Sequence, residues 1–226
     1  MMNAYFMFFS KAVPAMIKGS ALTIEIAVVS LMIGLLGGMP LAFLQVYGNR
    51  FFRMLCTVFA KLFRGTPLLV QLFLVYFGLP QFGIALSPMY AAFLTLGVNS
   101  AAYQMEYIRG AVISVGEGQM MTARAMGMSK VKAIRVIILP QVLRLMLPSW
   151  ANEAVYMIKN TAIVYLIAVP ELMAQTKILI SRFYNPIEAY LTVAVFYFVI
   201  VGIITLAFTV IENKVRIPGL EMEDVR

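Results

Sequence analysis

Polar and ionisable side chains interrupt an apolar stretch of the sequence between residues 152 and 161. They are Asn152, Glu153, Lys159, Asn160 and Thr161. Ionisable groups at membrane depth usually face a bundle interior or an aqueous cavity, where they mark a transport path. Glu153 and Lys159 are six residues apart, so an ideal helix separates them by nearly two turns and points them in different directions. Opposite charges separated along a cavity suit the ammonium and carboxylate groups of an amino acid.

An earlier apolar segment offers polar partners to this stretch. Asn99 and Tyr103 stand one helical turn apart, so they share a helix face. The candidate substrate path therefore consists of Asn99, Tyr103, Glu153, Lys159, Asn160 and Thr161. Two alternatives stay open: a buried polar network that only holds helices together, or an ion pair of Glu153 with an interfacial cation. Nearby, Glu106 and Arg109 are three apart, and we expect them simply to pair.

The composition places these residues in a membrane protein. Of 226 residues, 62% are hydrophobic and only 12% charged, whereas a soluble domain carries about 25% charge. The apolar runs predict an all-α membrane protein of about five transmembrane helices, near 19–45, 54–78, 89–108, 150–169 and 189–211. The second is expected to bend at residues 65–67, where a proline follows a glycine. In the first, Gly34, Gly37 and Gly38 predict close helix packing.

The charges predict domain limits and orientation. Residues 1–18 are expected to form an interfacial segment, residues 19–212 a single transmembrane domain, and residues 213–226 a cytoplasmic tail. The loop at 50–64 holds four cations and the connection at 109–144 holds six, whereas residues 79–88, expected to form a short outer loop, hold none. Residues 170–188 are expected to form a second outer loop with balanced charge. Because cytoplasmic loops are enriched in Lys and Arg, the N-terminus is predicted outside and the C-terminus in the cytoplasm.

The segment at 116–140 is the longest central stretch that cannot enter lipid. One charged side chain at the bilayer centre costs about 3 kcal/mol, and this segment carries several. The pattern predicts a helix, a left-handed turn at Gly127, and a second helix capped by Ser129. Such a segment suits docking on a soluble partner. The alternative is an amphipathic helix that lies on anionic lipid.

The sequence AMGMSKVKAIRVIILPQ, residues 125–141, closely resembles the EAA loop of permease subunits of ATP-binding-cassette importers, in the polar amino-acid uptake branch. Supporting matches are FRGTPLLVQLFLVYFGLP at 63–80, NSAAYQMEYIRGAVISV at 99–115 and LPSWANEAVYMIKNTAIV at 147–164. The chain departs from the family's Glu-Ala-Ala with Met-Thr-Ala at 121–123, and from its Lys-Asp-Thr-Ser with Lys-Asn-Thr-Ala at 159–162. The resemblance implies ATPase-docking residues, which here are Met121, Ala123, Arg124, Ala125, Gly127, Ser129 and Lys130.

The resemblance also implies partners and a location. They are two ATP-binding-cassette ATPase subunits that use ATP and Mg, a second permease subunit (identical or related), and an extracytoplasmic amino-acid-binding protein. The location would be the bacterial cytoplasmic (inner) membrane, with several passes. The chain itself has no GxxxxGK[ST] phosphate loop, so we expect ATP hydrolysis in a partner subunit and no enzyme activity in this chain. With no histidine and a single cysteine, Cys56, it is also expected to hold no cofactor and no metal.

Three other functions fit the sequence less well. An ion-gradient-driven secondary amino-acid transporter usually shows an internal repeat, which the sequence lacks. An intramembrane enzyme has few candidate groups, since the chain has no histidine, one cysteine and a single aspartate, Asp224. A nucleic-acid partner is not expected, because the cations behind the net charge of +8 sit in short loops beside apolar spans.

Overall fold

The computed structural model describes residues 2–215, apart from the side chains of residues 2–6 and 117, and in this part every element is helical. Most of the predicted tail, residues 216–226, lies outside the described residues. The helices are α1 Met2–Tyr47, α2 Arg50–Gly65, α3 Leu68–Phe73, α4 Pro88–Val115, α5 Glu117–Ala125, α6 Lys130–Ala133, α7 Leu139–Leu145, α8 Leu147–Asn160, α9 Leu172–Phe183 and α10 Pro186–Val215. Short π or 3-10 turns cover Leu74–Gly78, Leu79–Phe82, Ile134–Ile138 and Thr161–Ile167.

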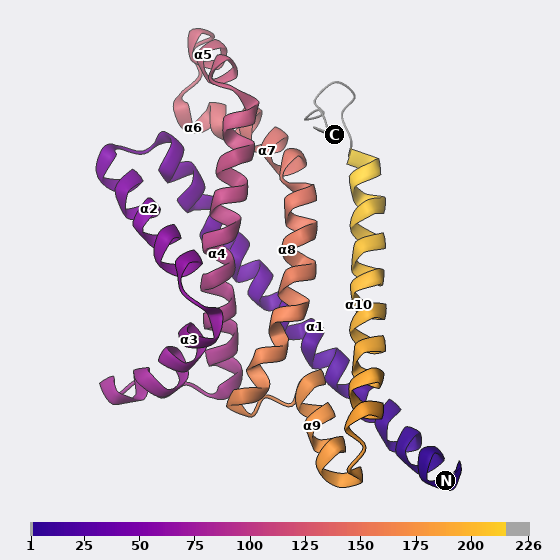
Figure 1. Cartoon of the computed structure of the whole chain (residues 1–226). Coiled ribbons are helices and arrows are strands. Elements are labelled where there is room, and N and C mark those ends of the chain that lie inside the picture. The colour runs from indigo at the N-terminus through magenta and orange to yellow at the C-terminus, as the bar shows by residue number, and fades with distance from the viewer. Residues whose placement is uncertain (1, 216–226) are drawn as a thin grey trace.

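Helix α1 crosses the molecule diagonally and packs along α4 (Figure 1). The two helices approach so closely at Gly34 that a Cβ there would lie 2.5 Å from Gln104 Nε2. At Gly38 a Cβ would lie 2.8 Å from the Ala101 carbonyl oxygen. The close packing predicted from the glycines of the first span is therefore confirmed.

The predicted interfacial segment, residues 1–18, continues the first span without a break, because α1 is one helix of 46 residues. Phe8, Ala12 and Met16 lie one turn apart, and all three are fully buried. The Phe8 ring meets the ring of Phe183 of α9 edge to face, with centroids 5.7 Å apart. The start of α1 is therefore covered on one side by protein.

The second predicted span bends sharply where the sequence places Gly65, Thr66 and Pro67. Helix α2 and the following helical stretch, residues 68–82, meet at 101°. Pro67 precedes the first turn of α3 in an extended conformation (φ −60°, ψ 134°). The bend is confirmed, but the segment is two helical arms rather than one straight crossing.

The stretch at 170–188, expected to be an outer loop, contains helix α9. Glu171 precedes this helix, and its carboxylate accepts a hydrogen bond from the Ala174 backbone N–H at 2.9 Å. Helices α8 and α9, with the 3-10 turn between them, form a second bent pair with an angle of 51°. The stretch is therefore helical from Leu172 to Phe183, and its place outside the membrane stays a prediction.

Two helices in the described part are long and apolar enough to cross a membrane by themselves, 7–47 and 186–215. The number rises to four if each of the two bent pairs is one span. Helix α4, predicted as the third span, is not among them. Its sequence carries Asn99, Gln104, Glu106 and Arg109, which lower its apolarity.

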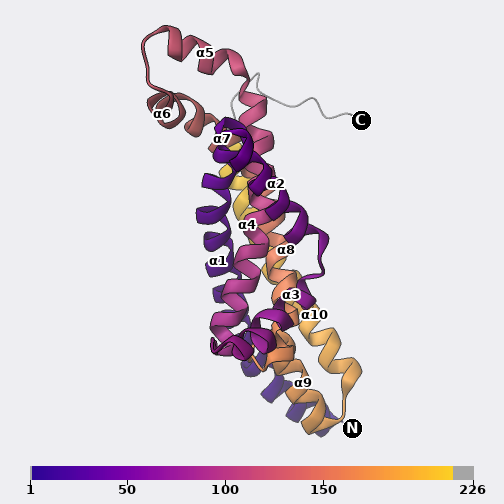
Figure 2. The same ribbon diagram turned by 90° about the vertical axis from the view of Figure 1, so that its left-hand side faces the viewer.

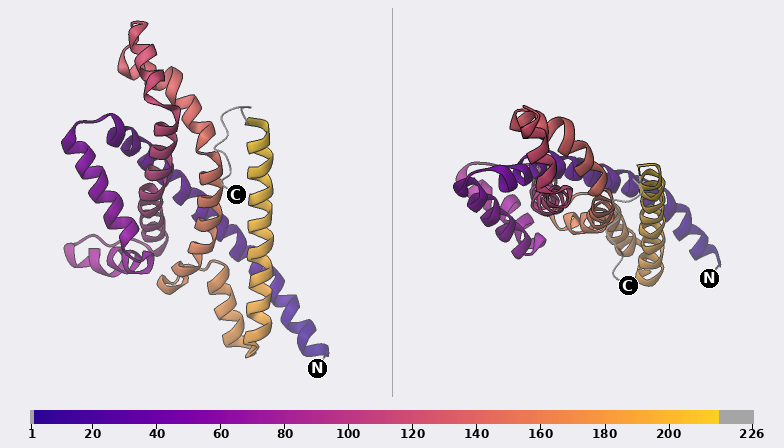
Figure 3. Two further views of the ribbon diagram at one scale, coloured as in Figure 1. Left: turned by 45° about the horizontal axis from the view of Figure 1, so that its top comes forward. Right: turned by 90° about the horizontal axis from the view of Figure 1, so that it is seen from above.

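The segment α5–α6 projects from one end of the molecule, and the start of α1 lies at the opposite end beside α9 (Figures 1 and 2). Seen from above, the helices spread along one direction (Figure 3). Buried apolar side chains form one cluster around α1, the start of α4, α8, α9 and α10, and a second around α1, α2, the later part of α4 and α7. Trp150 packs against both clusters.

Candidate functional site

The projecting segment folds as helix, turn, helix. Gly127 has a positive φ of 81°, and its backbone N–H donates to the Arg124 carbonyl at 3.0 Å. The Ser129 hydroxyl then accepts a hydrogen bond from the Lys132 backbone N–H at 3.3 Å and caps α6. The left-handed turn and the serine cap are confirmed. The turn favours glycine because other residues are strained at this φ.

Most of the predicted docking residues lie on the surface of this segment. Met121, Arg124, Ala125, Gly127, Ser129 and Lys130 are exposed, and Ala123 is buried with 1% of its surface accessible. Exposed apolar side chains accompany them, since Met121 and Met126 are 70% and 73% accessible. The segment thus presents a mixed apolar and basic surface.

Two cationic side chains of the α5–α6 segment stabilise its fold through hydrogen bonds to backbone carbonyls. Arg124 donates from Nη1 to the Met128 carbonyl at 3.1 Å, across the Gly127 turn. Lys130 donates from Nζ to the Tyr47 carbonyl at 2.6 Å, and its ammonium lies 5.3 Å from the centre of the Tyr47 ring. At the base, the Gln119 and Gln141 amides exchange hydrogen bonds at 3.2 and 3.0 Å. The segment is therefore fixed to the end of α1 and to α7.

Glu153 lies at the centre of a buried polar cluster between α1, α4 and α8. Its carboxylate accepts a hydrogen bond from the Ser100 hydroxyl at 2.7 Å, and the side chain is 2% accessible. Gln104 donates to the Leu31 carbonyl at 2.9 Å and to the Ser100 hydroxyl at 3.0 Å. The Trp150 indole N–H donates to Gln104 Oε1 at 3.0 Å. Ser100 and Gln104 complete the cluster, although the sequence did not single them out as site residues.

Asn99 and Tyr103, on the same helix, make different contacts. Asn99 Nδ2 donates to the Phe63 carbonyl and to Gln71 Oε1, both at 3.1 Å, and so holds the bend between α2 and α3. The Tyr103 ring lies 6.0 Å from the Tyr156 ring of α8, and the Arg64 guanidinium lies 5.3 Å from its centre. Tyr103 therefore joins α8 to α2.

The remaining predicted path residues lie at the end of α8 and are not brought together with Glu153. Lys159 is exposed, and Thr161 is buried and donates to the Ile158 carbonyl at 2.7 Å. The Asn160 Nδ2 group is buried and has no partner among the described residues. The separation of Glu153 from Lys159 agrees with the spacing argument.

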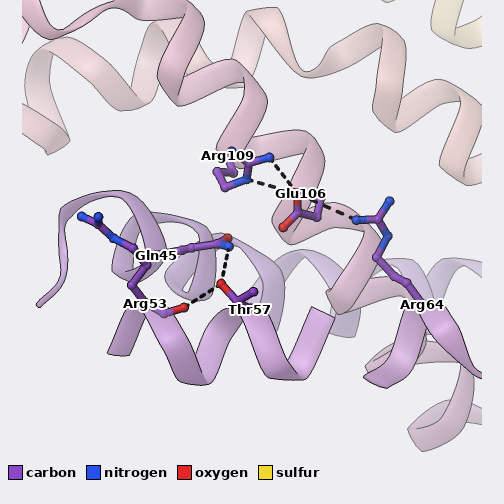
Figure 4. Close-up of polar contacts among 6 residues, drawn as sticks. All are labelled: Gln45, Arg53, Thr57, Arg64, Glu106 and Arg109. Atoms are coloured by element: carbon purple, nitrogen blue, oxygen red, sulfur yellow. Dashed lines mark hydrogen bonds and ion pairs between the residues drawn. The ribbon is translucent and has the colours of Figure 1, made fainter. Parts of the chain in front are cut away.

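An open pocket of about 520 Å³ lies between α1, α2 and α4, next to Tyr103. Its lining consists of Gln45, Thr57, Ala60, Lys61, Arg64, Gly65, Tyr103, Glu106 and Arg109. Figure 4 shows Glu106 between two arginines. Arg109 donates to Glu106 Oε2 from Nε and Nη2 at 3.1 and 2.9 Å, whereas Arg64 Nη1 stands 3.8 Å from the same oxygen. The predicted pair of Glu106 and Arg109 is confirmed, and Arg64 is an additional, looser partner.

A second buried carboxylate was missed. Glu171 is fully buried, and its Oε2 accepts from the Thr23 hydroxyl at 3.4 Å and the Tyr197 hydroxyl at 3.1 Å. This contact joins α1, α9 and α10. The only sequence signal is a glutamate just before a helical pattern, and glutamate is not among the preferred N-cap residues.

Comparison with known proteins decides the family. Residues 30–217 match the model of the binding-protein-dependent transport system inner membrane component. The chain belongs to this family. The glutamine transport system permease protein GlnP of Escherichia coli K12 is 35% identical over 91% of the chain and 95% of its own length. The nopaline transport system permease protein NocM of Agrobacterium fabrum is 35% identical over 85% of the chain and 84% of its own length.

Solved structures agree with the family. A crystal structure of an amino acid ABC transporter with histidines has a TM-score of 0.84 and 33% identity, over 92% of this chain and 98% of that one. The MetNI methionine ABC transporter in an inward-facing conformation has a TM-score of 0.77 at 20% identity, over 91% and 98%, which supports the fold alone. The all-helical architecture is therefore that of an ABC importer permease.

Proposed function

We propose that this permease forms the membrane path of an ATP-driven, binding-protein-dependent importer of polar amino acids. The observation that carries the proposal is the family match over residues 30–217. The structure adds an exposed helix–turn–helix segment, braced against α1 and α7, at one end of the molecule (Figure 2). The ion-gradient-driven alternative is not favoured, because the relatives are subunits of ABC systems.

Energy would enter through the projecting segment. Hydrolysis of ATP with Mg takes place in partner ATPase subunits, and two of them would each receive one such segment from two permease copies or related chains. The exposed Met121, Arg124, Ala125, Gly127 and Ser129 would contact the ATPase. Lys130 would link the segment to the membrane part of the protein. Its hydrogen bond to the Tyr47 carbonyl would transmit a rigid-body movement of the segment to α1.

The substrate path would run along the face of α8 that meets α4. Glu153 is buried next to Ser100, and a buried carboxylate in a transporter bundle is suited to an ammonium group. The unpartnered Asn160 amide and the exposed Lys159 lie further along α8, and either suits a carboxylate. Asn99 and Thr161 would shape this path through the backbone carbonyls they hold.

The proposed topology has five spans, of which the second runs from about residue 54 through the bend to residue 78 and the third covers residues 89–108 of α4. It places the start of α1 outside and the end of α10 in the cytoplasm of a bacterial inner membrane. The support is the opposite placement of the start of α1 and the α5–α6 segment, together with the cation-rich connections at the α5–α6 end (Figure 1). An extracytoplasmic binding protein would deliver the amino acid at the α9 end.

Substitution of the turn glycine tests the coupling function. Gly127→Asp places a side chain at a φ of 81° and a negative charge on the docking surface, so ATPase stimulation and uptake should both be lost while membrane insertion is kept. Gly118→Asp is the matched control, because Gly118 is exposed, has no positive φ, and has nothing within 4 Å of an added Cβ. Normal stimulation and uptake by the Gly127 variant would overturn the docking function.

A further inference from the structure

The pocket between α1, α2 and α4 has an excess of positive charge at one wall. Lys61, Arg64 and Arg109 line it against a single carboxylate, Glu106. Arg109 satisfies Glu106 with two hydrogen bonds, whereas Arg64 stands 3.8 Å from Glu106, with 41% of its side chain accessible and its guanidinium 5.3 Å from the centre of the Tyr103 ring. Lys61 has no ion pair among the described residues. Two cations are thus available to an incoming anion.

The lining of the same pocket also holds a hydrogen-bond acceptor that is unpaired among the described residues, on Gln45 of α1. Gln45 donates from Nε2 to the Thr57 hydroxyl at 3.4 Å, and Thr57 donates onward to the Arg53 carbonyl at 2.8 Å (Figure 4). The Gln45 Oε1 atom is buried and has no partner in the described part of the chain. A buried unsatisfied acceptor is costly, so a ligand N–H that reaches Gln45 would be favoured.

The pocket adjoins the path around Glu153. Tyr103 is a lining residue, and its ring contacts both Arg64 and the Tyr156 ring of α8. The pocket volume of about 520 Å³ falls in the range of sites for small polar molecules. Lining residues 103, 106 and 109 lie in the half of α4 nearer to α5, on the side of the docking segment.

We propose that this pocket is a cytoplasm-side binding station that holds the α-carboxylate of the transported amino acid on Arg64 and Lys61. The assignment rests on the proposed permease function. Arg64 is the exchangeable partner, because an exposed ion pair at 3.8 Å is weak and a ligand carboxylate would take the place of Glu106. Guanidinium binds a carboxylate in a planar two-point geometry, which a point charge does not offer. Glu106 stays held by Arg109 and, with Gln45, faces the ammonium end.

Cysteine protection tests this station directly. Thr57→Cys in a Cys56→Ser chain places this chain's only thiol on the pocket wall, within the complete transporter in phosphatidylcholine nanodiscs. N-ethylmaleimide labelling is measured with glutamine, arginine or histidine, and with the amine that each gives on losing its carboxylate: 4-aminobutanamide, agmatine or histamine. At about ten times the dissociation constant, the transported amino acid should slow labelling about tenfold, and its amine should not.

Two variants assign the effect to Arg64. Arg64→Gln should abolish protection, whereas Arg53→Gln, on the same helix but outside the pocket lining, should keep it. Protection by the amines as strong as by the amino acids, or no protection by any amino acid, would overturn the proposal. Slow labelling only when phosphatidylglycerol is added to the nanodiscs would overturn it as well, because the anion would then be a lipid phosphate. A loss of ATPase stimulation, with the amino acid still protecting the Thr57→Cys thiol from labelling, would instead indicate a defect in coupling to the ATPase and not in the pocket.

Discussion

Among single residues, Glu153 is the one on which the proposed substrate path depends most. Its carboxylate is 2% accessible and bound to Ser100, so Glu153→Gln keeps the shape and removes the charge. We expect amino-acid uptake to fall by about tenfold, which corresponds to about 1.4 kcal/mol, with the amount of assembled complex unchanged. Uptake of radiolabelled amino acid into proteoliposomes measures the effect. Glu25→Gln, at an exposed glutamate, is the control, and equal uptake in both variants would make Glu153 a structural group.

The close contact at Gly34 allows a prediction about the thermal stability of the transporter. An added Cβ would lie 2.5 Å from Gln104 Nε2 and 2.7 Å from Ser100 Oγ, so Gly34→Ala must push α1 away from the polar cluster on α4. We expect a loss of about 1–3 kcal/mol, seen as a lower thermal unfolding midpoint of the purified transporter. Gly110→Ala meets nothing within 4 Å and should leave the midpoint unchanged or higher. Equal midpoints for the two variants would contradict the close approach.

At the scale of elements, the bend between α2 and α3 depends on one buried amide. Gln71 Nε2 donates to the Phe63 carbonyl at 2.8 Å and to the Thr66 carbonyl and hydroxyl at 3.0 and 2.8 Å, and its Oε1 accepts from Asn99. Gln71→Leu would remove the side-chain donor to the Thr66 carbonyl and the acceptor for Asn99, and would leave the Phe63 carbonyl with Asn99 alone. The cost is about 1–3 kcal/mol for each buried group left without a partner.

The measured result should be a lower unfolding midpoint together with reduced uptake, because Arg64 and Tyr103 lie next to the released bend. Gln81→Leu provides the comparison, since Gln81 is exposed at the end of the same arm. A Gln71 variant that is as stable and active as the Gln81 variant would show that the bend is held by other contacts.

The elements differ in how much of them the sequence could predict. The α5–α6 segment was predictable because local rules decide it: charge keeps it in water, Gly127 takes the left-handed turn, and Ser129 caps the next helix. The bend at residues 65–67 was predictable for the same reason. Helix α9 was missed because its start depends on the burial of Glu171 against Thr23 and Tyr197, which are distant in sequence.

For the candidate site, the sequence could predict which polar residues matter, but it could not predict which residues they contact. Glu153 and Asn99 were found because polar groups stand out in an apolar run, but their partners follow from the crossing of α1, α4 and α8. Gln104 therefore gave no signal of its own, although it joins α1, α4 and α8. The pocket at Arg64 depends on the bend that brings the end of α2 against α4, which a linear pattern does not show.

At the scale of the whole molecule, orientation can be tested with single thiols. The chain has one cysteine, so a Cys56→Ser background with Ser129→Cys or Ser181→Cys places one exposed thiol at either end of the molecule. A membrane-impermeant maleimide should label Ser181→Cys in right-side-out vesicles and Ser129→Cys in inside-out vesicles freed of the ATPase, because we propose that the cation-rich end faces the cytoplasm. The reverse pattern would place the docking segment away from ATP.

We propose that this permease transports amino acids only with an ATPase docked on its projecting segment. Co-purification from native membranes, followed by an ATPase assay with a binding protein loaded with candidate amino acids, measures this dependence. We predict one ATPase subunit for each permease chain and a turnover that rises with the loaded binding protein. A chain that purifies without an ATPase, and whose uptake responds to an ion gradient but not to ATP, would contradict the account.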